Sequence, residues 1–277
     1  MALIFAVAAA VLIGTSDFWA ARAARTTPAI TVTRTAIGVS TLLTPFLLLL
    51  VASRWIVRDS LIGALSGLFM VSGLLLLYRG YAIARIGVVA PMSSVILAAV
   101  PVVVDAARGV RPSALSAVGI AIGLLALGLT GYTPGGTGSV RLGAVLGVSS
   151  GVLFGLAFTL MGEVSTEAGL APVVVQRVSG FLLLSVVAIF GSAPFFATDP
   201  SGRRAAVTAG ALGGIAMGAL QLAFQRGASG PVSVATSQFA TVAVILSVMF
   251  NHERMRWWQA VGVGATAVGV SLLALGA

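Results

Sequence analysis

The sequence contains no cysteine and no lysine, and it has a single histidine among its 277 residues. Without cysteine the chain cannot form disulfides, use a thiol as a nucleophile or bind a metal through thiolates. Without lysine it has no Walker A lysine, which excludes a self-contained ATP-driven pump. One histidine cannot supply the three or four ligands of a zinc site, so we expect neither a metal nor another cofactor.

Charged residues are also scarce, at 8% of the chain, whereas 58% of the residues are hydrophobic. A soluble domain has about 25% charged residues. Apolar stretches of about 20 residues, each long enough to cross a bilayer, recur along the chain. Ten such spans are predicted, at about 3–22, 29–52, 60–79, 86–104, 113–132, 140–161, 171–191, 204–224, 230–250 and 257–276. The sequence therefore predicts an all-α integral membrane protein, whose first span we expect to be retained rather than cleaved as a signal peptide.

The two halves of the sequence align without a gap when one is shifted by 143 residues, the separation of Arg34 from Arg177. The same shift carries Gly67 onto Gly210 and Tyr81 onto Phe224. Each half contains five predicted spans. A duplicated unit with an odd number of spans enters the bilayer in opposite orientations. The repeat therefore predicts ten transmembrane helices arranged as two inverted five-helix repeats.

The predicted boundaries follow from this repeat and from a change in composition. A stretch rich in Gly, Thr and Ser at 133–139 has the composition of a flexible linker. We therefore expect a first repeat at 1–132 and a second at 140–277.

Short motifs occur along both halves in a recognisable order. The first span carries Ile13-Gly14-Thr15-Ser16-Asp17-Phe18, and Arg34 lies a few residues into the second span. The fourth span carries Ser93-Ser94 followed by Pro101, and the final loop carries Glu253-Arg254. Gln259, Gly262 and Gly269 follow in the last span.

Together with ten spans and an internal repeat, these motifs resemble the EamA branch of the drug/metabolite transporter superfamily over essentially the whole chain. The resemblance implies a transporter whose central cavity is lined by both halves and opens alternately to either face. It also implies a small organic substrate, because members of known function mostly export amino acids, metabolites or drugs.

The sequence departs from the family's pattern at three places. Gly109-Val110-Arg111 stands where a Gly-Glu-Arg loop is usual, and Val244 stands where the repeat would place a proline equivalent to Pro101. Asp17 replaces the commoner asparagine. These differences leave the expected fold unaffected. Because of them, the substrate and the coupling ion of known family members cannot be assigned to this protein.

Asp17 is the one acidic residue inside a predicted span. A charge within a membrane costs several kcal/mol, so such a residue is a functional candidate. It would bind a substrate amine or carry a proton; alternatively, it is an interfacial aspartate that pairs with Arg22 or caps a broken turn. Other polar and aromatic side chains cluster on equivalent spans of the two halves. The predicted substrate cavity comprises Asp17, Tyr78, Tyr81, Ser93, Ser94, Phe158, Gln221, Gln225, Ser237 and Gln238.

The polar members of this set have an alternative role, because interhelical hydrogen bonds also use such side chains and contribute only about 0.6 kcal/mol each. Arg34 and Arg177 are interpreted as structural anchors, with a gate or a lipid-phosphate contact as alternatives. His252, Glu253 and Arg254 lie together in the last loop and are interpreted as an ion-pair cluster rather than a metal site.

The sixteen arginines give conflicting evidence on orientation. With the termini inside, the inner loops carry five arginines and the outer loops nine, whereas the positive-inside rule favours the opposite. The family resemblance implies termini inside, and we follow it.

The sequence thus predicts a transporter, not an enzyme, in what we expect to be a bacterial inner membrane. It would export small amphipathic solutes by alternating access, as a uniporter or with protons. A channel or facilitator-like pore is the alternative, and a membrane-embedded enzyme is disfavoured because no nucleophile with a base lies within the spans. Expected partners are a small-molecule substrate, lipid and protons, and no nucleic acid.

Overall fold

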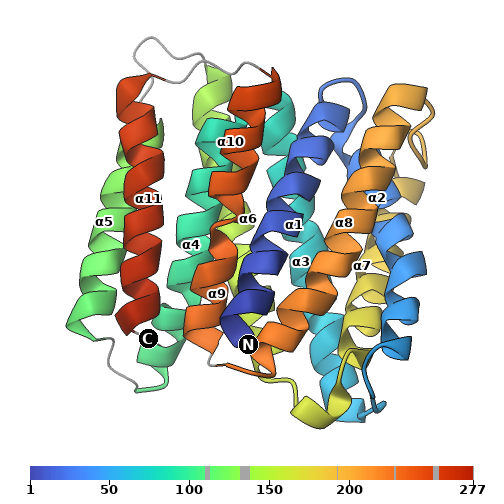
Figure 1. The fold of residues 1–277 in the computed structure, drawn as a ribbon. Helices are drawn as coiled ribbons and strands as arrows, with labels where there is room; N and C mark the ends of the chain where they lie inside the picture. The colour runs from blue at the N-terminus through green and yellow to red at the C-terminus, as the bar shows by residue number, and fades with distance from the viewer. Residues whose placement is uncertain (110–112, 132–137, 192, 228, 252–255, 277) are drawn as a thin grey trace.

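The chain forms a bundle of roughly parallel and antiparallel helices, seen in the computed structural model of Figure 1. The structure describes residues 1–109, 113–131, 138–191, 193–227, 229–251 and 256–276. In chain order the helices are α1 (Ala2–Ala24), α2 (Ala29–Leu43), the 3-10 helix η1 (Thr44–Leu49), α3 (Val57–Ile83), α4 (Ile86–Ala107), α5 (Ala114–Gly131), α6 (Gly138–Gly162), the 3-10 helix η2 (Thr166–Ala168), α7 (Ala171–Ile189), α8 (Pro200–Phe224), α9 (Ser229–Ser237), α10 (Phe239–Asn251) and α11 (Trp257–Gly276). The all-α prediction is confirmed for these residues.

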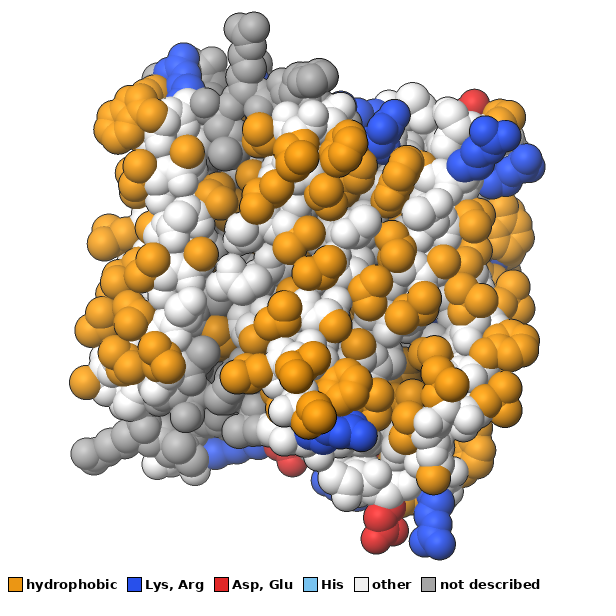
Figure 2. Space-filling model, viewed as in Figure 1, with side chains coloured by type: hydrophobic (Ala, Val, Ile, Leu, Met, Phe, Trp, Pro, Cys, Tyr) orange, Lys and Arg blue, Asp and Glu red, His pale blue; other side chains and the backbone are white. Residues whose placement is uncertain are grey.

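The helices follow the predicted spans in order, with α2 and η1 forming the second span and α9 and α10 the ninth. Within the described residues, seven segments are long and apolar enough to cross a membrane, judged by length and composition. They are Ala2–Ala24, Ala29–Leu49, Val57–Ile83, Ser139–Gly162, Ala171–Ile189, Pro200–Phe224 and Val232–Phe250. Hydrophobic side chains cover the middle of the face in Figure 2, and charged ones gather towards its two ends. Helices suit a lipid bilayer because their backbone N–H and C=O groups form hydrogen bonds within the same helix.

The N-terminus of α8 shows how the sequence begins a helix. Pro200 occupies its first position, where a missing N–H group has no intrahelical partner to lose. Asp199 is the N-cap, and its Oδ2 accepts hydrogen bonds from Gly202 N at 2.7 Å and from Ser201 Oγ at 2.5 Å. Because these bonds favour the carboxylate, they lower the pKa of Asp199.

The ninth span is interrupted at Gln238, whereas the sequence predicted one continuous helix over 230–250. Gln238 N bonds to Ala235 O at 3.4 Å, three residues earlier, which tightens the turn. The Ser237 hydroxyl donates to Val234 O at 2.8 Å, and such local bonds compete with regular helical pairing. The span is therefore divided into α9 and α10 without a proline.

Helices from the two halves of the chain pack against each other. The first helix of the first half, α1, contacts the third helix of the second half, α8. In the same way, the first helix of the second half, α6, contacts the third helix of the first half, α3. The second and third helices do the same, as α2 against α8 and α7 against α3, and α5 packs against α11. Figure 1 shows the two termini at the same end of the bundle.

Two repeat-related glycines lie where these helices approach most closely. A Cβ atom on Gly67 of α3 would overlap Ser179 Oγ and the Gln176 carbonyl of α7. A Cβ atom on Gly210 of α8 would overlap the backbone of Ala36 in α2. The 143-residue shift that carries Gly67 onto Gly210 also carries Ala36 onto Ser179, so the two contacts are equivalent.

Some sequence predictions lie outside the described residues. These are Arg111, most of the predicted linker at 133–139, and His252, Glu253 and Arg254 in the last loop. The domain boundaries derived from the repeat stay predictions.

Candidate functional site

A cavity of about 50 Å³ lies inside the bundle, with room for a few water molecules. Helices of both halves surround it, chiefly α1, α2 and α3 from the first and α6, α7 and α8 from the second. Its lining residues are Ile13, Ser16, Asp17, Ala36, Ile37, Ser40, Met70, Leu74, Tyr78, Leu97, Phe154, Phe158, Arg177, Ala209, Gly210, Gly213, Met217 and Phe239. We call this space the central cavity.

Asp17 is the acidic residue of the central cavity and is only 2% exposed. It is positioned by α1, and its Oδ2 accepts a hydrogen bond from the Tyr81 hydroxyl of α3 at 3.2 Å. The alternative pairing with Arg22 is not formed; the Arg22 guanidinium instead lies 5.5 Å from the centre of the Trp19 ring. Asp17 is thus an acidic group in the interior of the protein, held by a tyrosine.

Tyr78 and Tyr81 lie one turn apart on α3, and their rings stack with centroids 6.2 Å apart. Both are buried. Tyr78 lines the central cavity together with Asp17 and Arg177. The two tyrosines therefore form a stacked pair beside Asp17.

Arg177 supplies the positive charge of the central cavity. It lies on α7, is 4% exposed, and its Nε atom has no hydrogen-bond partner among the described residues. The sequence interpreted Arg177 as an anchor, so its place on the cavity wall was missed. Its alignment with Arg34 in the repeat was a signal that it has a position-specific role, but not that it faces a cavity.

Arg34, the repeat partner of Arg177, has different surroundings. Its NH2 group donates to Ser185 Oγ at 3.1 Å, and its guanidinium packs against the rings of Phe181, Phe195 and Phe196. Cation–π contacts and a hydroxyl therefore stabilise this buried charge. The structure places the two repeat-related arginines in unlike environments.

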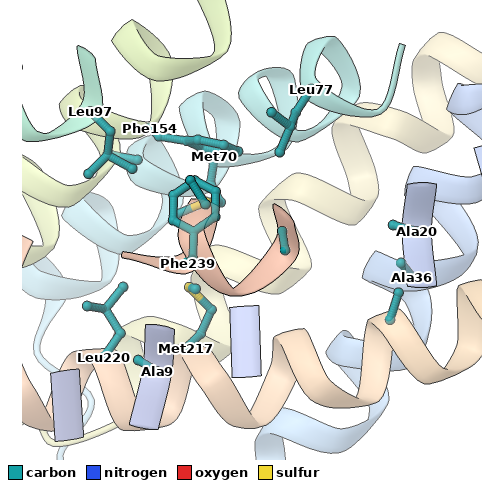
Figure 3. Packing of buried hydrophobic residues seen from close by; sticks show 14 of the residues in the cluster. Ala9, Ala20, Ala36, Met70, Leu77, Leu97, Phe154, Met217, Leu220 and Phe239 are labelled. Atoms are coloured by element: carbon teal, nitrogen blue, oxygen red, sulfur yellow. The ribbon is translucent and has the colours of Figure 1, made fainter. Parts of the chain in front are cut away.

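The rest of the central cavity is largely apolar. Met70 of α3, Phe154 and Phe158 of α6, Met217 of α8 and Phe239 of α10 form much of its wall. Figure 3 shows Phe239 close to both Met70 and Met217. Methionines are unbranched and adapt readily to a neighbour's shape, so this wall suits an apolar group of variable form.

A smaller hollow adjoins the central cavity and shares Met70, Phe158 and Met217 with it. Two glutamines, Gln176 and Gln221, line its far side. Gln176 Nε2 donates to Ser66 Oγ at 2.8 Å, whereas neither polar atom of the buried Gln221 side chain has a hydrogen-bond partner among the described residues. Two predicted cavity residues, Phe158 and Gln221, thus lie along this hollow.

A third space, about 360 Å³ in volume, lies at the end of the bundle opposite the termini. We call it the vestibule. It is lined by Arg25, Tyr81, Ala82, Ile83, Ala84, Arg85, Val88, Ser139, Val140 and Gln259. Since Tyr81 also contacts Asp17, these two side chains stand between the vestibule and the central cavity.

Five other predicted cavity residues do not line the central cavity in this conformation. The repeat-related Ser94 and Ser237 each donate to a carbonyl three residues earlier, at 2.9 and 2.8 Å. Ser93 Oγ lies 3.4 Å from a serine hydroxyl of α6, and Gln238 Nε2 lies 3.4 Å from a carbonyl of α11. Gln225, at the end of α8, donates to a loop carbonyl at 2.7 Å. Their role in binding stays a prediction.

The sequence of the second half matches a known family of membrane transporters. Residues 141–275 match the family described as the EamA-like transporter family. The second half of the chain belongs to the EamA-like transporter family. The predicted resemblance is thereby confirmed over this range, which corresponds to α6–α11. The coarse function follows: an integral membrane protein of a transporter family, whose members act on small molecules across a lipid bilayer.

Comparison with solved structures finds a shared fold over almost the whole chain. Twenty-four chains match. One, titled "Crystal structure of protein", superposes with a TM-score of 0.73 and 17% identity, covering 99% of this chain and 96% of its own. At this identity the match shows a shared fold alone. No curated protein matches the sequence.

Proposed function

We propose that this protein is an alternating-access carrier that exports small amphipathic organic solutes, such as amino acids, related metabolites or drugs. One observation carries the proposal: a buried cavity between helices of both halves holds a carboxylate, a guanidinium and a flexible apolar wall. Binding sites of carriers built from inverted repeats lie at such an interface. Because the cavity has room for only a few waters, this conformation is closed around the site, and a solute enters only when the helices move.

The moving units are the two halves, 1–132 and 140–277, arranged as inverted five-helix repeats. The equivalent contacts of Gly67 and Gly210 support a two-fold relationship between them. So do the reciprocal pairings of α1 with α8 and of α3 with α6. Two such units rock against each other and expose the central cavity first to one side and then to the other.

Transport is either uniport or coupled to a proton carried by Asp17, the acidic residue of the cavity. The membrane is a bacterial inner membrane with the termini inside, so that the vestibule faces outward and suits release by an exporter. Single cysteines at Arg54 and Arg203, near opposite ends of the bundle, test this orientation with an impermeant maleimide on intact cells. Labelling of R203C alone agrees with it, and labelling of R54C alone reverses it.

The deciding experiment is counterflow in proteoliposomes. Vesicles are loaded with one unlabelled amino acid or cationic dye at a time, and uptake of the same labelled compound is followed over time. A carrier gives a transient overshoot that saturates with solute concentration. Flux without overshoot or saturation indicates the channel or facilitator-like alternative, and chemical conversion without movement indicates an enzyme.

A further inference from the structure

The guanidinium of Arg177 is a buried charge without a counterion. No carboxylate of the described residues lies within 4.0 Å of its nitrogens, and its Nε atom has no hydrogen-bond partner among them. Its neighbour Thr41 donates to the Arg177 carbonyl at 3.1 Å, not to its side chain. Burying a charge costs free energy unless an opposite charge or a hydrogen-bonding group pairs with it. We therefore expect the Arg177 guanidinium to bind an anion.

The central cavity offers Arg177 one acidic neighbour, Asp17, and the two do not form an ion pair. Asp17 is engaged by Tyr81 instead. Tyr78 lines the same cavity and offers a hydroxyl, not a carboxylate counterion. The remaining cavity wall is largely apolar and has no further acid. The space in front of Arg177 is therefore where an anion from outside the protein would be accepted.

Arg34, the repeat partner of Arg177, also lacks a carboxylate partner among the described residues, but it lies outside the central cavity. Its buried guanidinium is surrounded by three phenylalanine rings and donates from NH2 to Ser185, whereas its Nε and NH1 atoms have no hydrogen-bond partner among the described residues. The two halves thus differ at this position: the Arg34 guanidinium is covered by aromatic rings, which leave no room for a ligand, whereas Arg177 lines the cavity.

We infer that Arg177 is the specificity-determining residue of the central cavity and that the transported solute carries a carboxylate. This inference rests on the proposed function. The planar guanidinium presents its N–H groups in a fork that matches the two oxygens of a carboxylate. The apolar body of the solute packs against Met70, Phe158 and Met217. An organic cation without a carboxylate leaves Arg177 uncompensated, so it is a poor ligand.

Three probes with the same ring separate these chemistries: phenylalanine, 3-phenylpropionate, which lacks the amine, and phenethylamine, which lacks the carboxylate. Binding to the full-length detergent-solubilised protein is measured as a shift of the thermal unfolding midpoint with ligand concentration. A matched aliphatic set (leucine, 4-methylpentanoate and isoamylamine) covers a smaller cavity. We expect the carboxylates to stabilise the wild type and the amines without a carboxylate to have little effect.

The variant Arg177→Gln is expected to weaken carboxylate binding by at least about tenfold, because it removes charge-assisted hydrogen bonds. Arg177→Lys keeps the positive charge but loses the paired N–H groups of the guanidinium. Its affinity for carboxylates is therefore expected to lie between those of the wild type and R177Q. Arg34→Gln is the matched control and leaves ligand selectivity unchanged. If R177Q does not fold, the wild-type probe series and R177K decide the question.

The inference is overturned if phenethylamine or isoamylamine binds as well as the matching carboxylate, if no carboxylate binds the wild type, or if R177Q binds carboxylates normally. Counterflow separates this failure from that of the proposed function. Transport of cationic dyes but not carboxylates refutes the role of Arg177 and keeps the carrier. Carboxylate binding that depends on Arg177 without any counterflow refutes the carrier and keeps the site.

Discussion

The Tyr81 hydroxyl donates a hydrogen bond to Oδ2 of Asp17 across 3.2 Å and thereby links α3 to α1. Asp17 lines the central cavity and Tyr81 lines the vestibule. The bond therefore stands between two spaces that a solute would have to connect. We interpret this pair as the gate of the central cavity on the vestibule side.

Replacing Tyr81 by Phe should weaken that gate, because it removes a hydrogen bond worth about 1 kcal/mol while keeping the ring. A single cysteine at Ser16, on the cavity wall, reports access to the cavity. We expect Y81F to raise the rate at which S16C reacts with a maleimide several-fold in the solubilised protein. Tyr78→Phe, which keeps the Tyr81–Asp17 bond, is the control. Equal rates in Y81F and wild type would show that this pair is not a barrier.

Asp17→Asn should abolish any pH dependence of transport, because an amide cannot bind and release a proton. The measurement is solute uptake into proteoliposomes with and without an imposed proton gradient. If Asp17 carries the proton, D17N keeps counterflow but no longer responds to the gradient. A gradient response that persists unchanged in D17N refutes proton transfer through Asp17, and Y81F serves as a control that retains the carboxylate.

Adding a methyl group at Gly67 or Gly210 should destabilise the protein, since each Cβ would overlap the backbone of a helix from the other half. Overpacking of this kind costs about 1–3 kcal/mol. We expect G67A and G210A to lower the thermal unfolding midpoint by similar amounts, because their contacts are related by the repeat. Gly264→Ala is the control, since nothing lies within 4 Å of its Cβ position. Destabilisation at only one of the two sites would argue against a two-fold relationship.

At the end of the bundle that carries the termini, polar links join the two halves. Arg108 pairs with Glu163 at 2.7 Å, and the buried Asp59 accepts hydrogen bonds from the backbone N and the hydroxyl of Ser165. The repeat places Gly202 at the position equivalent to Asp59, so this second link has no counterpart at the other end. We interpret these links as closing the termini side of the central cavity.

Asp59→Ala should therefore open the termini side. It removes the acceptor for Ser165, and leaving a buried donor unpaired costs about 1–3 kcal/mol. The readout is faster maleimide labelling of a single cysteine at Gln221, in the smaller hollow. Glu167→Ala is the control, because its ion pair with Arg54 spans 3.8 Å and both side chains are largely exposed. Equal labelling in D59A and wild type would show that the Asp59 link does not close this side.

Much of the fold could be predicted from the sequence, because apolar run length is a strong signal in a membrane protein. Helix boundaries agree within a few residues for α1, α5 and α11. The break at Gln238 was missed, since it depends on local bonds of Ser237 and Gln238 and not on a proline or glycine. The α3 helix starts at Val57, earlier than predicted, and includes the buried Asp59, which the sequence placed outside the span.

The candidate site was only partly foreseen. Asp17, Tyr78 and Phe158 were predicted because polar and aromatic side chains within a span are candidates for contact with a solute. All three line the central cavity. Serines are harder to assign to a cavity, because a serine hydroxyl can donate its hydrogen bond to a backbone carbonyl of its own helix, as Ser94 and Ser237 do. Arg177 was assigned as an anchor because its sequence position, near a helix start, is typical of one.

The sequence by itself determined that the chain is a helical membrane protein, because long apolar runs and few charges can be read directly from the order of the residues. It also predicted an internal repeat, from the constant 143-residue shift. The tertiary structure alone decided which side chains meet. Asp17 and Arg177 are 160 positions apart, and no local pattern encodes that both line one cavity. Packing between α1, α3 and α7 brings Asp17 and Arg177 to the same cavity. Glycines let the helices approach closely enough to enclose that cavity.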